Sequence, residues 1–336
     1  MAAERYGLSL SRRTFVRSAG FAGLVLLAGC GRLPRAEQPV TIRRLGVLAF
    51  ENRAASERAT LPVHQELREL GYGDHNLAVE YRAAEWQPER LPGLAAELVS
   101  QGVEVLLTMG EVVARAAMQA TTTTPIVFRT SGDPVPRLVP SYAHPGGNAT
   151  GVTMVSSQLA GKRLDLLKQL MPATSRVAVL WQPSHADTDF PGTQSAAQAL
   201  GIELLSLELR DPGDIESAFE IASGWRPDAL IVVANRLTLA YPGRIMALAA
   251  QQRLAVVAQR REYAEAGSVL TYGPSEADSY RRLAYYLDRI FKGTQPADLP
   301  VEQPTRFELV VNLKAARELG LAIPQHVLLQ ATEIIQ

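Results

Sequence analysis

The chain has 336 residues, 47% of them apolar and 20% charged, which is enough to bury two cores, because single cores stop growing near about 250–300 residues. The charges of the 34 basic and 34 acidic residues cancel. Without residues 1–29, which contain four arginines and one glutamate, 30 basic and 33 acidic residues remain. This slightly negative balance gives no excess of positive charge for binding nucleic acid. One cysteine, Cys30, excludes an internal disulfide and a thiolate metal cluster.

The N-terminal segment has the features of an export signal. Arg12-Arg13-Thr14-Phe15 precedes an apolar run, residues 19–28, that is too short to cross a bilayer as a helix. The arginine pair resembles the twin-arginine export motif, and Leu27-Ala28-Gly29-Cys30 resembles the lipobox of bacterial lipoproteins. We therefore expect a signal peptide over residues 1–29 and a lipid on Cys30, which begins a flexible tether over residues 30–40. The alternative is that Cys30 is one more small apolar residue ending the signal core.

From residue 42 onward, short β-rich runs alternate with helix-period stretches, which predicts parallel sheets flanked by helices. A first lobe is expected to contain strands at 45–50, 79–81, 103–108 and 126–128, with helices at 61–70, 89–100 and 112–120. Gly71 is well placed to end the first of these helices.

A second series follows the turn at residues 145–148. A segment at 151–155 leads to helices at 159–170, 194–200, 215–222 and 244–252, which alternate with strands at 177–181, 203–207, 229–233 and 254–257. A strand at 269–272, a long helix at 276–291, a Pro-rich crossing at 296–304 and a last strand and helix at 308–319 complete the chain. Several crossings between two open sheets predict a hinge, with a ligand cleft at the carboxyl ends of the strands.

Six blocks of this chain carry a family resemblance: RLGVL at 44–48, DPV at 133–135, PGGNATG at 145–151, RVAVL at 176–180, YGP at 272–274 with YRR at 280–282, and PTRFELVVNLKAA at 304–316. Together they resemble the ABC transporter substrate-binding protein family, in the branch related to tryptophan- and tyrosine-binding importer lipoproteins. The resemblance covers roughly residues 43–336.

The resemblance implies the α/β fold of type I periplasmic binding proteins, in which two Rossmann-like lobes with parallel sheets are joined by a multi-crossing hinge. The N-terminal lobe is expected to comprise residues 41–153 plus 274–300, and the C-terminal lobe residues 154–273 plus 301–336. The implied partners are a small-molecule ligand such as an aromatic amino acid, and ABC permease subunits. The lipid on Cys30 is expected to anchor the protein to the membrane. We expect an exported monomer that faces the periplasm or cell exterior.

Candidate ligand contacts in the first lobe follow the predicted strands. Thr108, Gly110 and Glu111 lie where a strand ends and a helix begins, so backbone N–H groups there are placed to receive a ligand carboxylate. Glu111 would compete with such an anion, or would only stabilise the helix start. Asp133 can accept a hydrogen bond from a ligand amine or hydroxyl, or act as an N-cap before Pro134.

Three aromatic residues, Phe50, Trp181 and Tyr272, each end a predicted strand, which favours stacking on an apolar or planar ligand in the cleft. Ordinary packing explains each of them equally well.

In the second lobe, the family resemblance implies polar ligand contacts just past strand ends, at Gln182, Ser184 and Asn235. Tyr263 matches a position where the family carries an aromatic or acidic residue near the cleft, although a solvated turn explains the charges of Arg260-Arg261-Glu262 equally well.

No enzyme motif appears in the sequence. The five histidines are scattered without metal-ligand spacing, and neither a nucleotide-binding loop nor a serine-hydrolase elbow is present, so no metal, no cofactor and no catalytic residue is predicted. The main alternative is a sensing protein that presents its ligand to a membrane receptor kinase. A hydrolase that uses Asp133 and Glu111 is weaker still, and a transcriptional regulator is remote because an export signal stands where a DNA-binding motif would be.

Overall fold

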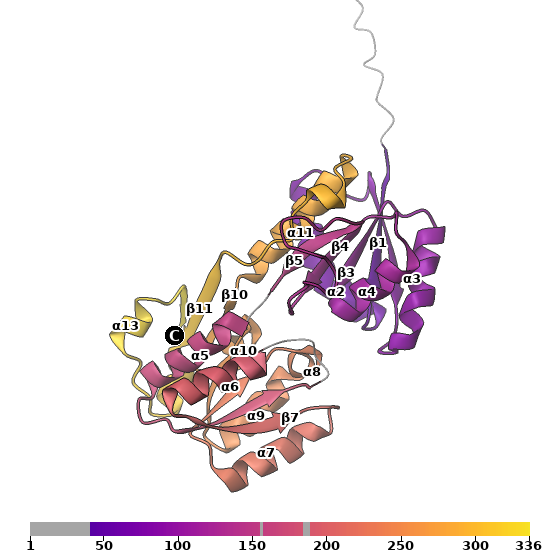
Figure 1. Ribbon diagram of the computed structural model, residues 1–336. Coiled ribbons are helices and arrows are strands. Elements are labelled where there is room, and N and C mark those ends of the chain that lie inside the picture. The colour runs from indigo at the N-terminus through magenta and orange to yellow at the C-terminus, as the bar shows by residue number, and fades with distance from the viewer. Residues whose placement is uncertain (1–40, 155–156, 184–188) are drawn as a thin grey trace, which may run out of the picture. The chain divides into compact units, whose positions relative to one another are not determined.

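The computed structural model describes residues 41–154, 157–183 and 189–336 (Figure 1). The signal peptide, Cys30, the tether up to residue 40 and Ser184 lie outside the described residues. In the part of the chain that is described, no helix has the length and apolar character needed to span a membrane.

The first sheet has five parallel strands in the order β2-β1-β3-β4-β5. Their bounds are Arg43–Ala49 (β1), Leu77–Ala83 (β2), Val105–Met109 (β3), Ile126–Thr130 (β4) and Ala149–Thr153 (β5). Leu45 and Val47 belong to the core on one face and Leu48 to the core on the other. Burial on both faces explains why β1 reads as a continuous apolar run.

Helices cover both faces of this sheet. α2 (Arg53–Glu69) and α11 (Glu276–Phe291) share one core with the sheet, whereas α3 (Leu91–Ser100), preceded by the short helix η1 (Pro88–Arg90), and α4 (Glu111–Ala120) share the other. α2 begins eight residues before the predicted start at residue 61, because the Asn52 side chain accepts a hydrogen bond from the Ala55 N–H at 2.9 Å and caps it there. Pro62 lies inside the helix.

The second sheet has seven strands in the order β12-β11-β10-β9-β8-β6-β7. Their bounds are Arg176–Trp181 (β6), Glu203–Glu208 (β7), Ala229–Val232 (β8), Ala255–Ala258 (β9), Leu270–Pro274 (β10), Phe307–Asn312 (β11) and Glu333–Ile335 (β12). β6 to β10 are parallel, as predicted, but β11 pairs antiparallel with β10 and carries β12 with it. The prediction of two α/β lobes with parallel sheets is confirmed, and β11 adds an antiparallel pairing at one edge of the second sheet.

The helices of the second lobe again pack on two cores. α5 (Ser157–Leu170) and α6 (Asp189–Leu200) lie on one side with α12 (Leu313–Glu318) and α13 (Gln325–Leu328), and α7 (Asp214–Trp225) and α9 (Pro242–Gln251) lie on the other. Two helices of five residues, α8 (Arg236–Ala240) and α10 (Arg261–Glu265), follow β8 and β9. Neither was predicted, because five residues are too few to show a helical period.

Three segments of chain run between the two sheets. β5 leads into α5, β10 leads into α11, and the segment after the short helix η2 (Pro296–Asp298) runs to β11. That last segment is attached to the first sheet, because the Val301 N–H donates to the Tyr142 carbonyl at 2.7 Å and the Glu302 N–H donates to the Gly151 carbonyl at 3.1 Å. Each lobe is therefore completed by chain that returns from the other.

Candidate functional site

A cavity of about 160 Å³ lies at the carboxyl ends of strands from both sheets. From the first lobe it is lined by residues that end or follow β1, β3, β4 and β5, and from the second by residues after β8 and β9 and at the end of β10. The lining residues are Glu51, Met109, Gly110, Arg129, Thr130, Ser131, Met154, Ala234, Asn235, Arg236, Leu239, Gln259, Arg260, Pro274 and Glu276. This is the position at which open α/β sheets bind their ligands.

A second cavity, of about 930 Å³, continues from the first. The two share the lining residues Leu239, Gln259, Arg260, Pro274 and Glu276. Thr271 also lines the larger cavity, and its side-chain hydroxyl is buried without a hydrogen-bond partner in the described part of the chain. A buried hydroxyl of this kind is usually satisfied by a polar group of a ligand or by water.

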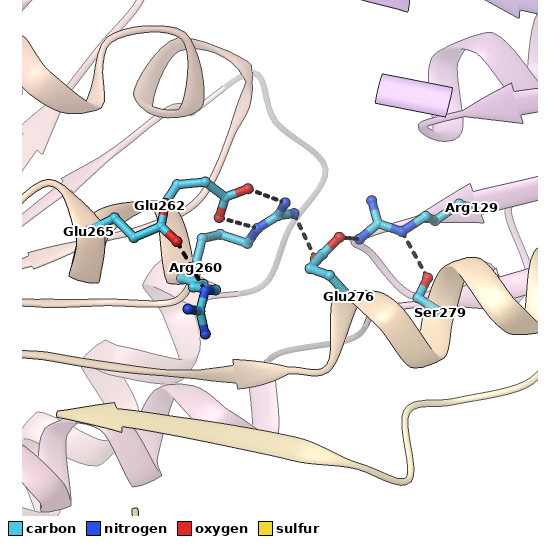
Figure 2. A network of polar contacts seen from close by, with 7 residues as sticks. Arg129, Arg260, Glu262, Glu265, Glu276 and Ser279 are labelled. Carbon is cyan, nitrogen blue, oxygen red and sulfur yellow. Dashed lines mark hydrogen bonds and ion pairs between the residues drawn. The ribbon is translucent and has the colours of Figure 1, made fainter. Parts of the chain in front are cut away.

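An Arg–Glu–Arg bridge lies where the two cavities meet, because both Arg260 and Glu276 line both of them. Figure 2 shows the Glu276 carboxylate between Arg129, on β4, and Arg260, after β9. Its Oε1 is 2.7 Å from Arg260 Nη1 and its Oε2 is 2.5 Å from Arg129 Nη2. Both arginine side chains are 16% exposed and that of Glu276 is 21% exposed, so solvent screens these pairs less than pairs on the surface.

Each arginine of this bridge has a further partner. Arg260 Nη2 is 2.9 Å from an oxygen of Glu262, and Arg129 donates through Nε to the Ser279 hydroxyl at 2.9 Å (Figure 2). Burial disfavours the charge on Arg260, but Glu276 and Glu262 outweigh that effect and raise its pKa above the ordinary value. The guanidinium of Arg129 also lies 5.4 Å from the centre of the Tyr280 ring. Burial raises the pKa of the Tyr280 hydroxyl, and the charge of Arg129 opposes that rise. The charges of Arg129 and Arg260 are thus already compensated within the protein.

Arg236 is the third arginine of the smaller cavity, and it reaches from the second lobe to the first. Its guanidinium lies 4.5 Å from the centre of the Phe50 ring, Nη2 is 3.3 Å from the Met109 carbonyl oxygen, and Nε is 3.4 Å from Glu51 Oε1. Gly110 lies directly below it: φ is +104°, and a Cβ added there would be 2.7 Å from Arg236 Nη2. Only glycine fits this position without strain.

Two of the predicted contacts, Gly110 and Asn235, line the smaller cavity. Asn235 is buried and caps α8, because its side chain accepts from the Thr238 N–H at 3.0 Å while the Thr238 hydroxyl accepts from the Asn235 N–H. Phe50 takes part indirectly, as the surface on which Arg236 lies. Thr108 is completely buried in β3, one residue before the lining begins.

Glu111 is turned to other partners. Its side chain is 5% exposed and forms ion pairs with Arg115 and, at 3.2 Å, with Arg137. Glu111 does not belong to the lining of the smaller cavity, and both of its carboxylate oxygens are engaged. The expected competition between Glu111 and an anionic ligand therefore loses its basis.

Asp133 is exposed and stabilises its own loop. One carboxylate oxygen accepts from the Val135 N–H at 2.9 Å and from the Tyr142 hydroxyl at 2.8 Å. The residues after it form a turn and no helix, so the N-cap interpretation with Pro134 at the first helical position is wrong; the local bond is that of an Asx-turn.

The remaining aromatic residues are occupied by packing contacts. Trp181 is stacked on Phe190 with 4.3 Å between ring centres and donates from Nε1 to the Ser206 hydroxyl at 2.8 Å. Tyr272 packs at 6.2 Å from Phe307. Tyr263 is fully buried, and its hydroxyl donates to the Thr238 carbonyl at 2.6 Å.

Of the second-lobe polar residues, Gln182 follows β6 and is half-buried, without joining the linings of the 160 and 930 Å³ cavities. The solvated-turn interpretation of residues 260–263 is corrected for Arg260, whose side chain is largely buried at the start of α10.

The charged residues of the cavity were missed by sequence reasoning. Glu51, Arg129, Arg236 and Glu276 each stand near the end of a strand or up to four residues beyond it. The one available signal was Arg129, a cation that directly follows the buried run Ile126–Phe128. In the described ranges no group of three or more His, Cys, Asp or Glu side chains is arranged to hold a metal ion.

Comparison with known proteins shows the family to which this chain is related. The family model described as ABC transporter substrate binding protein matches residues 44–335. The chain is also 22% identical to a tyrosine-binding protein of Clostridioides difficile (strain R20291) over 319 residues, and this alignment covers 90% of each chain.

Two solved structures share the fold over 88% of this chain and 100% of their own. One is a conserved domain protein from Vibrio cholerae, with 25% identity and a TM-score of 0.79. The other is an ABC domain from Streptococcus pneumonia in complex with L-Trp, with 22% identity and a TM-score of 0.78.

Proposed function

The chain belongs to the ABC transporter substrate-binding protein family, and from that premise we propose that it captures a small solute between its two lobes outside the cytoplasmic membrane and delivers it to an ABC importer. The observation that carries the proposal is the origin of the smaller cavity, whose walls come from strand ends of both sheets.

Such a cavity couples binding to the relation between the lobes. A solute that touches both Gly110 and Asn235 makes all of its contacts only when the two lobes are together. Binding then shifts an open population towards a closed one, with the three connecting segments as the hinge. The closed form is what the permease would recognise.

An aromatic amino acid, or a compound of similar size and polarity, is the proposed solute. The relative from Clostridioides difficile is a tyrosine-binding protein, and the domain from Streptococcus pneumonia was solved in complex with L-Trp. The cavities of this chain supply both kinds of surface that such a ligand needs: apolar walls at Pro62, Leu239 and Tyr280, and charged groups at Arg236 and Glu51.

We expect the right solute to raise the midpoint temperature of thermal unfolding of the purified full-length protein in mild detergent. A ligand that binds only the folded state adds about 2.7 kcal/mol of stability at 100 times its Kd. The screen should contain amino acids, purines and small aromatic compounds, and X-ray scattering with the best compound should show a smaller radius of gyration.

Two glycine variants locate the binding event. Gly110→Ala should abolish most of the ligand-induced shift, because its Cβ would meet Arg236 in the cavity. Gly102→Ala should keep the shift, because Gly102 also has a positive φ, +71°, but faces open space. A screen without any stabilising compound would contradict the proposed function, and an unchanged radius would contradict closure.

We also propose that a lipid on Cys30 holds the protein at the membrane, with residues 1–29 removed on export. Cys30 is the only thiol of the chain, so labelling with a palmitate analogue reports on this residue alone. Cys30→Ser should lose the label and move from the membrane fraction to the soluble fraction, since acyl chains supply the anchoring energy. A Cys30→Ser protein that still takes up the label would exclude lipid attachment at this residue.

A further inference from the structure

Arg236 differs from the other two arginines of the smaller cavity in how it is paired. Arg129 and Arg260 share the Glu276 carboxylate at 2.5 and 2.7 Å. Arg236 has one carboxylate within ion-pair distance among the described residues, that of Glu51, and the separation is 3.4 Å. Charge-assisted hydrogen bonds between a guanidinium and a carboxylate are usually about 2.7–2.9 Å long. The Arg236–Glu51 pair is therefore the loose one.

Glu51 has the matching property. Its side chain is 22% exposed, lines the smaller cavity, and has Arg236 as its single ion-pair partner in the described part of the chain. The residue after it, Asn52, caps α2 through the Ala55 N–H, which fixes the loop that presents Glu51. Glu51 thus belongs to the first lobe and Arg236 to the second, with opposite charges facing one cavity.

The guanidinium of Arg236 is positioned by groups other than Glu51. It lies on the Phe50 ring at 4.5 Å and against Gly110, and Nη2 is 3.3 Å from the Met109 carbonyl. These contacts do not use Nη1, for which the described residues give no hydrogen bond or ion pair. A ligand anion can therefore be received without dismantling the contacts that hold the side chain.

We propose that Arg236 and Glu51 together recognise the two charges of an α-amino-acid zwitterion, with the carboxylate on Arg236 and the ammonium on Glu51. This inference rests on the proposed function and names the chemical feature that the site selects. A ligand with both charges replaces a loose internal pair by two well-formed pairs. A ligand with one charge would leave either Arg236 or Glu51 without a partner in a closed site, where an uncompensated charge is costly.

Matched ligands test this assignment. The probes are L-tyrosine, tyramine, which lacks the carboxylate, and 3-(4-hydroxyphenyl)propionate, which lacks the amine. The wild-type protein should bind L-tyrosine at least about tenfold more tightly than either analogue, as measured by isothermal titration calorimetry. Arg236→Gln should weaken tyrosine and the propionate about tenfold but not tyramine, because tyramine no longer leaves a charged Arg236 without a partner. Glu51→Gln should weaken tyrosine and tyramine about tenfold but not the propionate, because the propionate no longer leaves a charged Glu51 without a partner.

Arg244→Gln is the matched control, because Arg244 also pairs with a glutamate, Glu216, and lies 6.0 Å from an aromatic ring, that of Tyr241, away from the lining of the cavity. It should leave all three affinities within twofold. An equal loss of affinity for all three ligands in Arg236→Gln would show that Arg236 acts on closure alone. Equal wild-type affinity for the three ligands would show that the site does not discriminate by ligand charge. Either result overturns the inference.

If none of the three ligands of the tyrosine series binds, the same test is repeated with L-tryptophan, tryptamine and indole-3-propionate. If both series fail to bind, zwitterion recognition is overturned. The proposed function would then still stand if another compound of the solute screen bound, and would fall with it if none did.

Discussion

Arg163→Met is expected to lower the free energy of unfolding by about 3–5 kcal/mol, the range for removing one partner of a buried ion pair. Arg163, on α5, and Asp189, at the start of α6, are each 1% exposed, with Arg163 Nη2 3.0 Å from Asp189 Oδ1. Arg163 also donates through Nη1 to the Tyr272 carbonyl at 3.3 Å, so one side chain joins two helices to β10. Methionine fills much of the volume but removes the Arg163 cation from the buried Asp189 carboxylate.

Urea unfolding followed by tryptophan fluorescence measures this effect, because Trp181 and Trp225 both lie in the second lobe. Lys162→Met is the control: it removes a cation from the neighbouring position of α5, but Lys162 is 37% exposed and pairs with a half-exposed Asp165. Its cost should stay within about 0.5 kcal/mol. The double variant Arg163→Met with Asp189→Leu should cost less than Arg163→Met alone, and a single variant as stable as the Lys162 control would refute a structural role for the pair.

Gly273→Ala should be destabilising by about 3 kcal/mol or more and should also impair the cavity, because overpacking here meets backbone and not a flexible side chain. A Cβ on Gly273 would be 2.2 Å from the Gln259 carbonyl oxygen. β10 and β9 would have to separate where Gln259, Arg260 and Pro274 form the cavity walls. The thermal shift caused by the best solute should therefore decrease along with the unfolding temperature.

The comparison variant for this change is Gly243→Ala. Gly243 lies in α9 with nothing within 4 Å of an added Cβ, so alanine should change stability by no more than about 1 kcal/mol and leave ligand binding intact. Equal behaviour of the two variants would mean that the β9–β10 spacing adjusts freely, and the packing argument for Gly273 would fail.

The fold was largely predictable because it follows from local patterns. Buried parallel strands read as continuous apolar runs, and α11 was predicted over residues 276–291, the range that the structure has. The direction of β11 was not predicted, because a strand shows the same apolar pattern whether it runs parallel or antiparallel to its neighbour. β11 pairs antiparallel with β10 after a crossing that returns from the first lobe.

The candidate site was predictable in location but not in chemistry. Two of the residues predicted at strand ends, Gly110 and Asn235, line the smaller cavity; their role in ligand binding stays a prediction. Asp133 and Glu111 are used by the protein itself, in an Asx-turn and in ion pairs, and the position of a side chain along a strand does not reveal such partners.

The sequence by itself predicted the two α/β lobes, because period, turn residues and chain order are local properties. The family followed from the resemblance of its sequence blocks, and the family model over residues 44–335 confirms it. Only the tertiary structure decided that Arg129, Arg236, Arg260, Glu51 and Glu276 surround the smaller cavity, and which of them neutralise one another. Ion pairing depends on distances of a few ångströms between residues as far apart in the chain as Glu51 and Arg236. Those distances exist only once both sheets are packed and the chain has crossed between them.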